Sequence, residues 1–394
     1  MSRYRRPFDG CPRLVRVALG AATLGIAGLL AGLVAAPRQF FVAYLAAYAF
    51  AVTIAVGALL FLMICHAMRA TWPVALRRLV EATVGTLPLL AILFVPLLFG
   101  LRSLYPWLRP ESIADEHERQ LVLHKLPYLN PSFFVARTAL YFAIWIAAGA
   151  LLRGWSLRSD LDPTRDPSAK LQTLSVAALP PVALAISFAA FDWLMSLTPA
   201  WFSTMFPVYV FAGGFLGAIA VLTLLTSASH RAELLPGLSS SHYHALGRLL
   251  LAFTVFWAYA AFFQFFLVWI ANRPDEAIYY AARMRRPWKG PSVVLVFAQF
   301  VLPFLALLNY DLKRRRGPLT ALAIWLIAAH YVDVHWLVAP ALRPAGPPYH
   351  WLDVAALLAV GGVTVAYGAW RLRGHPIVPI HDPALARALA YESS

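Results

Sequence analysis

Long apolar runs alternate with short polar segments along almost the whole chain. An apolar run of about 20 residues is long enough to cross the hydrocarbon core of a bilayer as a helix. The pattern predicts ten such helices, at 14–35, 40–67, 76–101, 133–152, 171–197, 204–228, 244–271, 291–311, 318–340 and 351–370. We therefore expect an all-α integral membrane protein with a single polytopic membrane domain over residues 1–394.

Two of these predicted helices end alike, which indicates an internal repeat. In the fifth helix Asp192 precedes Pro199 by seven residues. In the ninth helix Asp333 precedes Pro340 by the same interval. Because parallel membrane repeats keep their orientation when each contains an even number of helices, the hypothesis is two parallel four-helix bundles. They comprise helices two to five (40–197) and six to nine (204–340), and the first and tenth helices flank them.

Prolines fall inside the third, fifth and eighth predicted helices. Each proline removes a backbone donor and kinks its helix, which a membrane tolerates best against protein or water. We therefore expect these helices to line the interior of the bundle. The prolines concerned are Pro88, Pro96, Pro180, Pro181 and Pro303.

The composition agrees with a lipid environment. Hydrophobic residues make up 61% of the chain and charged residues 13%, where a soluble protein has about 25% charged residues. A net charge of +15 would indicate nucleic-acid binding in a soluble protein, but here the basic residues sit between apolar runs. Placing both termini in the cytoplasm puts the larger share of the 33 lysines and arginines on that side, as the positive-inside rule requires. We expect no nucleic-acid partner.

The cysteines and histidines form no recognisable cofactor motif. Cys11 and Cys65 belong to no CxxC, CxxCH or iron–sulfur pattern, which excludes covalently attached haem and a disulfide framework. His66, His330 and His335 fall at different predicted depths, so no pair suits a b-type haem. We expect no metal and no cofactor bound by this chain, and any redox centre would belong to another polypeptide.

Ionisable side chains inside the predicted helices are the candidate functional residues, because each costs about 2.5–3.5 kcal/mol to insert. His330 and Asp333 lie three residues apart on one helix face, where they can hydrogen-bond and relay protons, or simply hold helices together. Glu81 can pair with Arg77 and Arg78 or admit protons. The proton-path candidates are Asp192, His330, Asp333 and Asp353, expected as one external polar cluster, with Glu81 and His66 towards the cytoplasm.

A second set of polar residues lies in the external halves of the predicted helices. Arg137 can reach the interface, pair with one of the acids, or bind an anionic or quinone head group. The quinone or anion candidates are Arg137, Tyr141 and Gln264. Two long external connections, 104–131 and 272–291, are either ordered loops or docking surfaces for a peripheral subunit.

Several segments resemble the ActF subunit of bacterial alternative complex III, in the NrfD- and PsrC-like group of membrane subunits. The resemblance covers most of the chain and is most specific between residues 187 and 272. The segments are Ser187–Leu197 with Trp201-Phe-Ser-Thr, Phe253–Asn272, Arg77–Glu81, Leu104–Trp107 and Phe133–Arg137.

The resemblance implies a quinol:electron-acceptor oxidoreductase in the bacterial inner membrane. This subunit would contribute to the quinone-associated membrane sector and to a possible proton path, with quinone or quinol as its possible ligand. Haem c and iron–sulfur clusters would lie in partner subunits. The implied partners are an ActC-like paralogous membrane subunit, iron–sulfur and multihaem cytochrome c subunits, small membrane-anchored subunits, and lipid.

Two other functions remain open. Parallel repeats, proline-broken helices and acids within the membrane are also typical of secondary transporters. A purely structural membrane anchor is the third hypothesis, in which the polar residues only connect helices.

Overall fold

The computed structural model describes residues 7–162, 166–235 and 237–393. All regular structure in these residues is helical, and ten helical segments are long and apolar enough to cross a membrane. The predicted all-α fold of a multi-pass membrane protein is thus confirmed. The ten segments are α1 (Pro12–Ala35), α2 (Pro37–Ala67), Trp72–Phe99, α7 (Pro131–Leu161), α8 (Ser168–Trp193, extended to Leu197 by a 3-10 turn), α9 (Phe206–Arg231), α10 (Ser240–Ala271), Lys289–Leu308, α15 (Arg316–Leu342) and α16 (Trp351–Leu372).

Two of the ten segments are interrupted. The third consists of a 3-10 turn (Trp72–Leu76), α3 (Arg77–Val84) and α4 (Leu87–Phe99). The eighth consists of α12 (Lys289–Val296), a π-helical turn (Phe297–Val301) and α13 (Leu302–Leu308). In the eighth segment Pro303 lies two residues after the end of the π-helical turn, where its missing N–H suits the altered hydrogen-bond pattern.

The prolines within the predicted helices differ in exposure, and one pair does not face the interior of the described chain. Helix α8 continues through Pro180 and Pro181, and both rings are exposed on its surface. A pyrrolidine ring is apolar, so it suits a lipid-facing position as well as a buried one. Pro303 is buried as expected, and Pro88 and Pro96 are partly buried.

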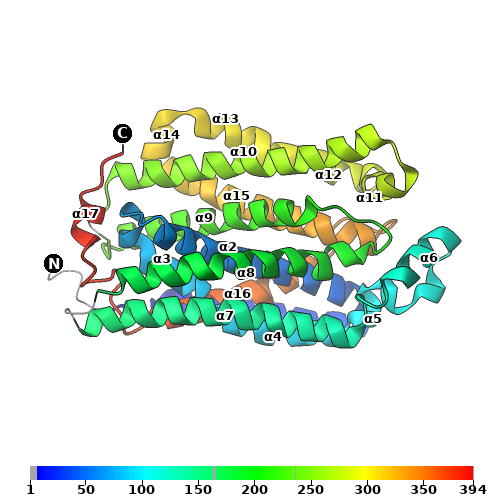
Figure 1. Cartoon of the computed structure of the whole chain (residues 1–394), viewed down its shortest axis with the longest axis horizontal. Coiled ribbons are helices and arrows are strands. Elements are labelled where there is room, and N and C mark those ends of the chain that lie inside the picture. The colour runs from blue at the N-terminus through cyan, green and yellow to red at the C-terminus, as the bar shows by residue number, and fades with distance from the viewer. Residues whose placement is uncertain (1–6, 163–165, 236, 394) are drawn as a thin grey trace.

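Helix α2 is the centre of the molecule and packs against α8, α9, α15 and α16 (Figure 1). Within residues 40–197, α2 also contacts α3 and α4, and α7 contacts α4 and α8. Within residues 204–340, α9 contacts α10 and α15, α10 contacts α13, and α12 contacts α15. Helix α1 lies mainly along α16. The internal repeat in the sequence stays a prediction.

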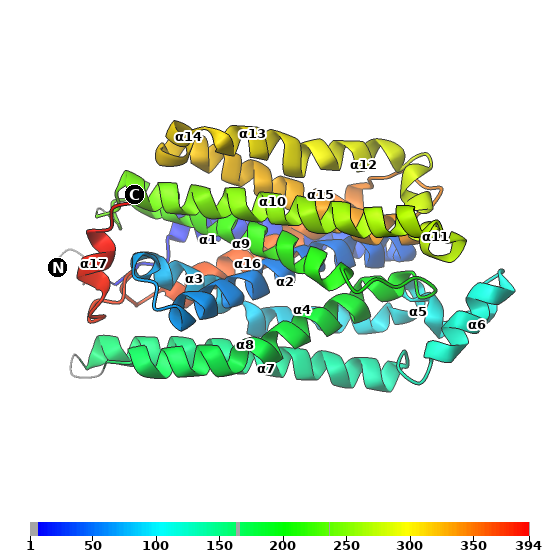
Figure 2. The same ribbon diagram turned by 45° about the horizontal axis from the view of Figure 1, so that its top comes forward.

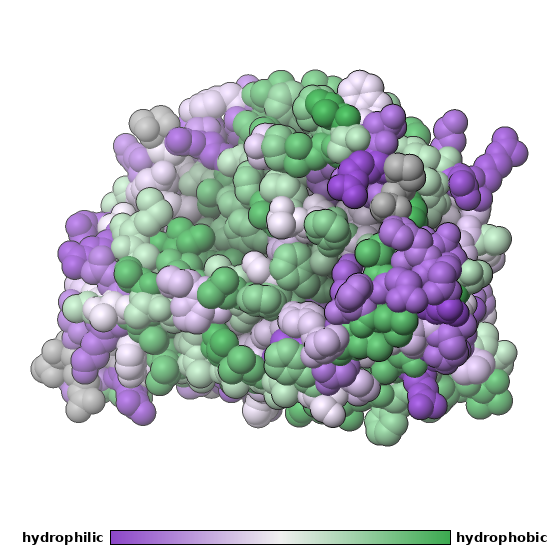
Figure 3. Space-filling model, turned by 45° about the vertical axis from the view of Figure 1, so that its right-hand side comes forward, coloured by the Kyte–Doolittle hydropathy of each residue, from purple (hydrophilic) through white to green (hydrophobic). Residues whose placement is uncertain are grey.

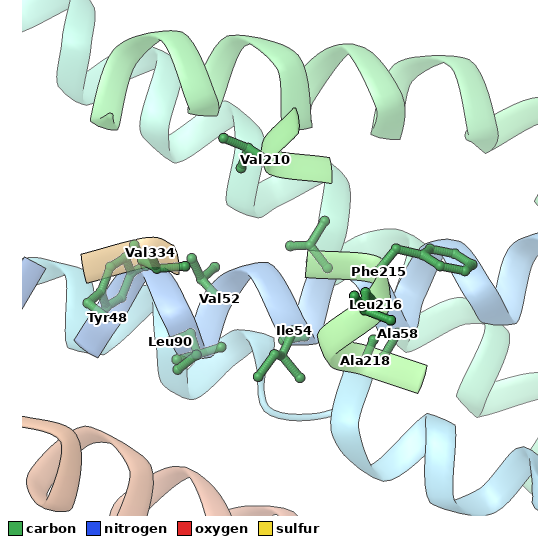
Figure 4. Close-up of a cluster of buried hydrophobic side chains, with 14 of the residues drawn as sticks. Tyr48, Val52, Ile54, Ala58, Leu90, Val210, Phe215, Leu216, Ala218 and Val334 are labelled. Carbon is green, nitrogen blue, oxygen red and sulfur yellow. The ribbon is translucent and has the colours of Figure 1, made fainter. Parts of the chain in front are cut away.

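The contact between α2 and α9 joins these two groups of helices closely. A Cβ atom on Gly57 would lie 2.5 Å from the backbone oxygen of Gly214, so only glycine allows this approach. Small residues of this kind let membrane helices come into backbone contact. Figure 4 shows apolar side chains of α2, such as Ile54, beside Leu216 and Ala218 of α9.

Polar segments gather at the two ends of the helices (Figures 1 and 2). One end, here called the α6 end, carries α5 (Leu101–Leu104), α6 (Glu116–Lys125) and α11 (Pro274–Met284). The other, the α17 end, carries α14 (Tyr310–Arg314) and α17 (Leu385–Leu389). At the α17 end the backbone N–H of Phe8 donates to the carbonyl of His375 at 3.0 Å, which joins the first and last parts of the described chain. Figure 3 shows apolar side chains on the flank between the ends.

Candidate functional site

The four acids predicted inside the helices are all buried, and each has its own partners. Glu81 lies towards the α17 end, while Asp192, Asp333 and Asp353 lie towards the α6 end, on α8, α15 and α16. No hydrogen bond or ion pair among the described residues connects the last three acids with one another. The expected external cluster is therefore three separate groups, because each helix takes its polar partners from its own neighbours.

Asp192 is held by an arginine and a tyrosine from α7. Arg137 donates from Nε to Oδ2 at 2.8 Å and from Nη2 to Oδ1 at 2.9 Å, and the hydroxyl of Tyr141 donates to Oδ2 at 2.7 Å. The guanidinium also lies 3.8 Å from the ring centroid of Tyr128 and donates to its carbonyl. The hydroxyl of Ser196 donates to the backbone oxygen of Asp192 and not to its carboxylate. Arg137 thus forms the pair with an acid that the sequence allowed, and Tyr141 bonds the same carboxylate.

Asp353 is also bound by an arginine. Arg343 donates to both of its oxygens, at 2.9 and 3.0 Å, and Nε2 of His335 lies 3.3 Å from Oδ2. The backbone N–H of His350 donates to Oδ2 at 2.7 Å, so the carboxylate also caps the start of α16. Sequence reasoning missed Arg343, because nothing in its position after the ninth helix shows that the chain turns back onto Asp353.

Glu81 forms the predicted ion pair near the α17 end. Nη1 of Arg78 donates to Oε2 of Glu81 at 2.6 Å, while Nε of Arg77 lies 3.7 Å from Oε1. Arg78 also pairs with Asp160 of α7, and Arg77 pairs with Asp382 at 2.8 Å. These contacts tie α3 to α7 and to the C-terminal segment. His66 lies beside Arg77 in the lining of a small cavity of about 20 Å³, and its Nε2 has no hydrogen-bond partner.

Asp333 differs from the other three acids. It is 1% exposed, its Oδ1 accepts from the hydroxyl of Tyr209, and its Oδ2 accepts from Nε1 of Trp257 at 3.1 Å. Within the described part of the chain, no lysine or arginine nitrogen lies within ion-pair distance of its carboxylate. A buried carboxylate without a cation is costly in an apolar interior, and it favours a nearby group that can carry a proton.

His330 is that group. Its Nδ1 lies 3.8 Å from Oδ2 of Asp333, too far for the hydrogen bond expected from the sequence but within ion-pair distance. Its Nε2 lies 3.1 Å from Oγ1 of Thr53 on α2. Two glycines of α9 make room for the pair: a Cβ on Gly217 would lie 2.7 Å from Cδ2 of His330, and one on Gly213 3.0 Å from Oδ2 of Asp333.

The hydrogen bonds of Thr53 indicate where the proton of a neutral His330 lies. The Thr53 hydroxyl is 2.8 Å from the carbonyl of Ala49, and when it donates there it accepts from Nε2–H of His330. Nδ1 is then unprotonated, has no hydrogen-bond partner, and faces the Asp333 carboxylate. One added proton at Nδ1 would turn this contact into an imidazolium–carboxylate pair. Nδ1 is therefore the ring nitrogen at which a neutral His330 can accept a proton.

A small cavity adjoins this pair through Thr53. It has a volume of about 40 Å³ and is lined by residues of α2, α7, α8 and α9, among them Thr53, Trp193 and Gly214. A cavity of this size has room for about one water molecule. Thr53 therefore links this cavity to Nε2 of His330.

Gln264 and a buried arginine complete the polar groups at the α6 end. Gln264 donates to the hydroxyl of Tyr280 at 3.0 Å and accepts from Ser203 at 3.3 Å, so its amide is engaged. Sequence reasoning missed Arg283 of α11, which is 1% exposed and bonds the carbonyls of Tyr279 and Leu337. Burial lowers the pKa of Arg283, and no carboxylate pairs with it in the residues that the structure covers.

No group of three or more histidine, cysteine or acidic side chains suited to a metal occurs in the described residues. No protein-family model matches the chain, and a search of curated proteins finds no match. The likeness to ActF-type subunits therefore stays a prediction from the sequence segments that carry it.

Proposed function

We propose that this chain is a membrane subunit of a quinol:electron-acceptor oxidoreductase of the alternative complex III type, and that its His330–Asp333 pair handles protons. The observation that carries the proposal is the Asp333 carboxylate, which is buried without an arginine and lies 3.8 Å from a histidine nitrogen that has no other partner. An imidazole nitrogen that faces a carboxylate can accept a proton and pass it on.

The chemistry of quinol oxidation needs such a group. Removing two electrons from a quinol releases two protons, and a positioned base, such as a carboxylate or a neutral imidazole, can accept them. The other three acids predicted inside the helices are bound by arginines, which suits them to holding helices together rather than to exchanging protons. The electrons would pass through haem c and iron–sulfur clusters held by partner subunits.

The proposal also covers the partner subunits of the chain and the membrane in which it lies. Its partners would be an ActC-like paralogue, iron–sulfur and multihaem cytochrome c subunits and small membrane-anchored subunits, and it would lie in the bacterial inner membrane. The α17 end would face the cytoplasm, which the concentration of basic residues at that end supports. These residues include Arg69, Arg77, Arg78, Arg371, Arg373 and the run from Lys313 to Arg316.

Isolation of the full chain from its own membranes in mild detergent tests the assembly. We expect co-purification of proteins that show the absorbance of c-type haem and the electron paramagnetic resonance signals of iron–sulfur clusters. A lone stable chain that takes up a solute in proteoliposomes would instead support the transporter hypothesis.

Asp333→Asn in the intact complex tests the proton role. The substitution keeps the side-chain shape but removes the charge, so quinol-driven reduction of the acceptor should fall at least tenfold and its pH profile should change. Gly217→Ala should reduce turnover without touching an ionisable group, because its Cβ would displace the His330 ring. Asp311→Asn, on the exposed surface of α14, is the matched control and should behave as wild type. Full turnover and unchanged proton release in Asp333→Asn would leave the chain a structural anchor.

A further inference from the structure

A basic cavity lies near the α17 end, between α7 and the end of α16 with the residues that follow it. Its volume is about 350 Å³, the largest among the cavities described here. Its basic lining residues are Arg153, Arg371, Arg373 and His375, and no acidic side chain lines it. Leu157 and Trp370 complete an apolar side. The proposed proton site uses none of these residues.

The arginines of this cavity have donors without acceptors. Arg153 is 5% exposed, and its Nη2 donates to the carbonyl of Arg371, which joins α7 to α16. Its Nη1 is buried with no hydrogen-bond partner, and so is Nε of Arg371. A buried guanidinium donor left unpaired is costly, which indicates that an acceptor belongs in the cavity.

The acids near this cavity are already engaged. The charge of Glu81 attracts Arg153, and the charge of Asp160 favours the protonated form of His375. Both acids, however, are paired with Arg78. The lining therefore keeps a net positive charge for a ligand. Arginine recognises phosphate with particular strength because its planar fork of donors matches the oxygens of the phosphate group.

The apolar side of the cavity includes an exposed tryptophan. Trp370 is 56% exposed at the end of α16. Tryptophan is enriched where transmembrane helices end, at the membrane–water interface. A ligand here would meet arginines on one side and an apolar, lipid-facing wall on the other. That combination fits the head group of a phospholipid better than a free inorganic ion, because the ion would leave the apolar wall unused.

We infer that this cavity binds the phosphate of an anionic phospholipid, with its acyl chains running along the lipid-facing surface beside Trp370. Basic pockets between transmembrane helices on the cytoplasmic side are suited to anionic head groups. The bound lipid would supply acceptors to Arg153 and Arg371 and would fasten α16 to α7. This inference does not depend on the proposed redox function.

Lipid binding to the purified full chain, with any subunits that remain attached, tests the inference. The protein is depleted of lipid in mild detergent, and phosphatidylglycerol, phosphatidylcholine or inorganic phosphate is then added while bound lipid is measured by native mass spectrometry and stability by thermal unfolding. We expect phosphatidylglycerol to bind and to raise the unfolding temperature, and phosphatidylcholine and phosphate to have little effect.

Two arginine substitutions separate the cavity from general surface charge. Arg373→Gln should weaken phosphatidylglycerol binding about fivefold, the effect of one basic residue at a membrane surface. Arg158→Gln removes the same charge from an exposed position of α7 outside the cavity, and should bind as wild type. Equal loss in both variants, equal binding of phosphatidylcholine, or full stabilisation by inorganic phosphate would each overturn the assignment to an anionic lipid.

Discussion

The surroundings of Asp192 and Asp333 predict losses of stability of very different size for the same substitution. Asp192→Asn removes the charge that faces the Arg137 guanidinium at 2.8 and 2.9 Å and leaves that cation buried without its partner. Breaking a buried ion pair on one side costs about 3–5 kcal/mol. Asp333→Asn leaves no cation behind, and its amide oxygen can still accept from Tyr209. The remaining loss is about one hydrogen bond, to Trp257, or about 1 kcal/mol.

A second substitution tests the origin of the larger cost. Asp192→Asn combined with Arg137→Met removes both charges and keeps an oxygen for the hydroxyl of Tyr141. Replacing both members of a buried ion pair by neutral groups is often neutral in stability. The double variant should therefore recover most of the free energy of unfolding that Asp192→Asn loses.

The assay is the free energy of unfolding of the purified chain in mixed micelles, titrated with a denaturing detergent and followed by tryptophan fluorescence. The expected order of stability is wild type, then Asp333→Asn and the double variant close together, then Asp192→Asn well below. An Asp333→Asn variant as unstable as Asp192→Asn would refute the distinction. So would a double variant no more stable than the single one, because the cost would not then come from the unpaired arginine.

Two further predictions concern other parts of the molecule. Gly25→Leu should detach α1 from α16, because a Cβ there would lie 2.3 Å from the backbone nitrogen of Ala359. A disulfide cross-link between cysteines introduced into the two helices should then no longer form. The control Gly20→Leu, whose Cβ would meet open space, should keep the cross-link. His375 has its pKa lowered by burial and by nearby arginines, so it is neutral at pH 7 and a bound anion would raise its pKa. Phosphatidylglycerol binding should therefore strengthen as the pH falls from about 7.5 to about 5.5, and His375→Asn should flatten that profile in the same binding assay. The other charged groups that act on His375 are Arg153, Arg78, Asp160 and Arg371.

The sequence predicts the helices of this protein better than their polar partners. Apolar runs locate all ten spans, since the bilayer requires a helix of a certain length wherever the chain crosses it. The buried acids could be found too, because an acid inside an apolar run is rare. The partners of Glu81, Arg77 and Arg78, could also be predicted, because they lie within one helical turn of it in the sequence.

Partners from other helices could not be read in the same way. Asp160 lies 82 residues from Arg78 and Asp192 lies 55 residues from Arg137, separations that only the packing of the helices relates. Asp192 and Asp333 end their helices alike, yet α7 brings an arginine to the first and α9 and α10 bring a tyrosine and a tryptophan to the second. The feature that distinguishes Asp333 is thus the absence of a neighbour, which no local pattern records.

The packing of α1 has a consequence for how the protein is made. Its buried stripe, which includes Ala22 and Gly25, lies mainly against α16, the last of the ten spans along the chain. Spans enter the membrane in the order in which they are synthesised. Helix α1 therefore has no α16 to pack against until residues 351–372 have been inserted. A polypeptide that stops short would leave this stripe open to lipid. Helix α1 can therefore pack in its final position only after translation has reached α16.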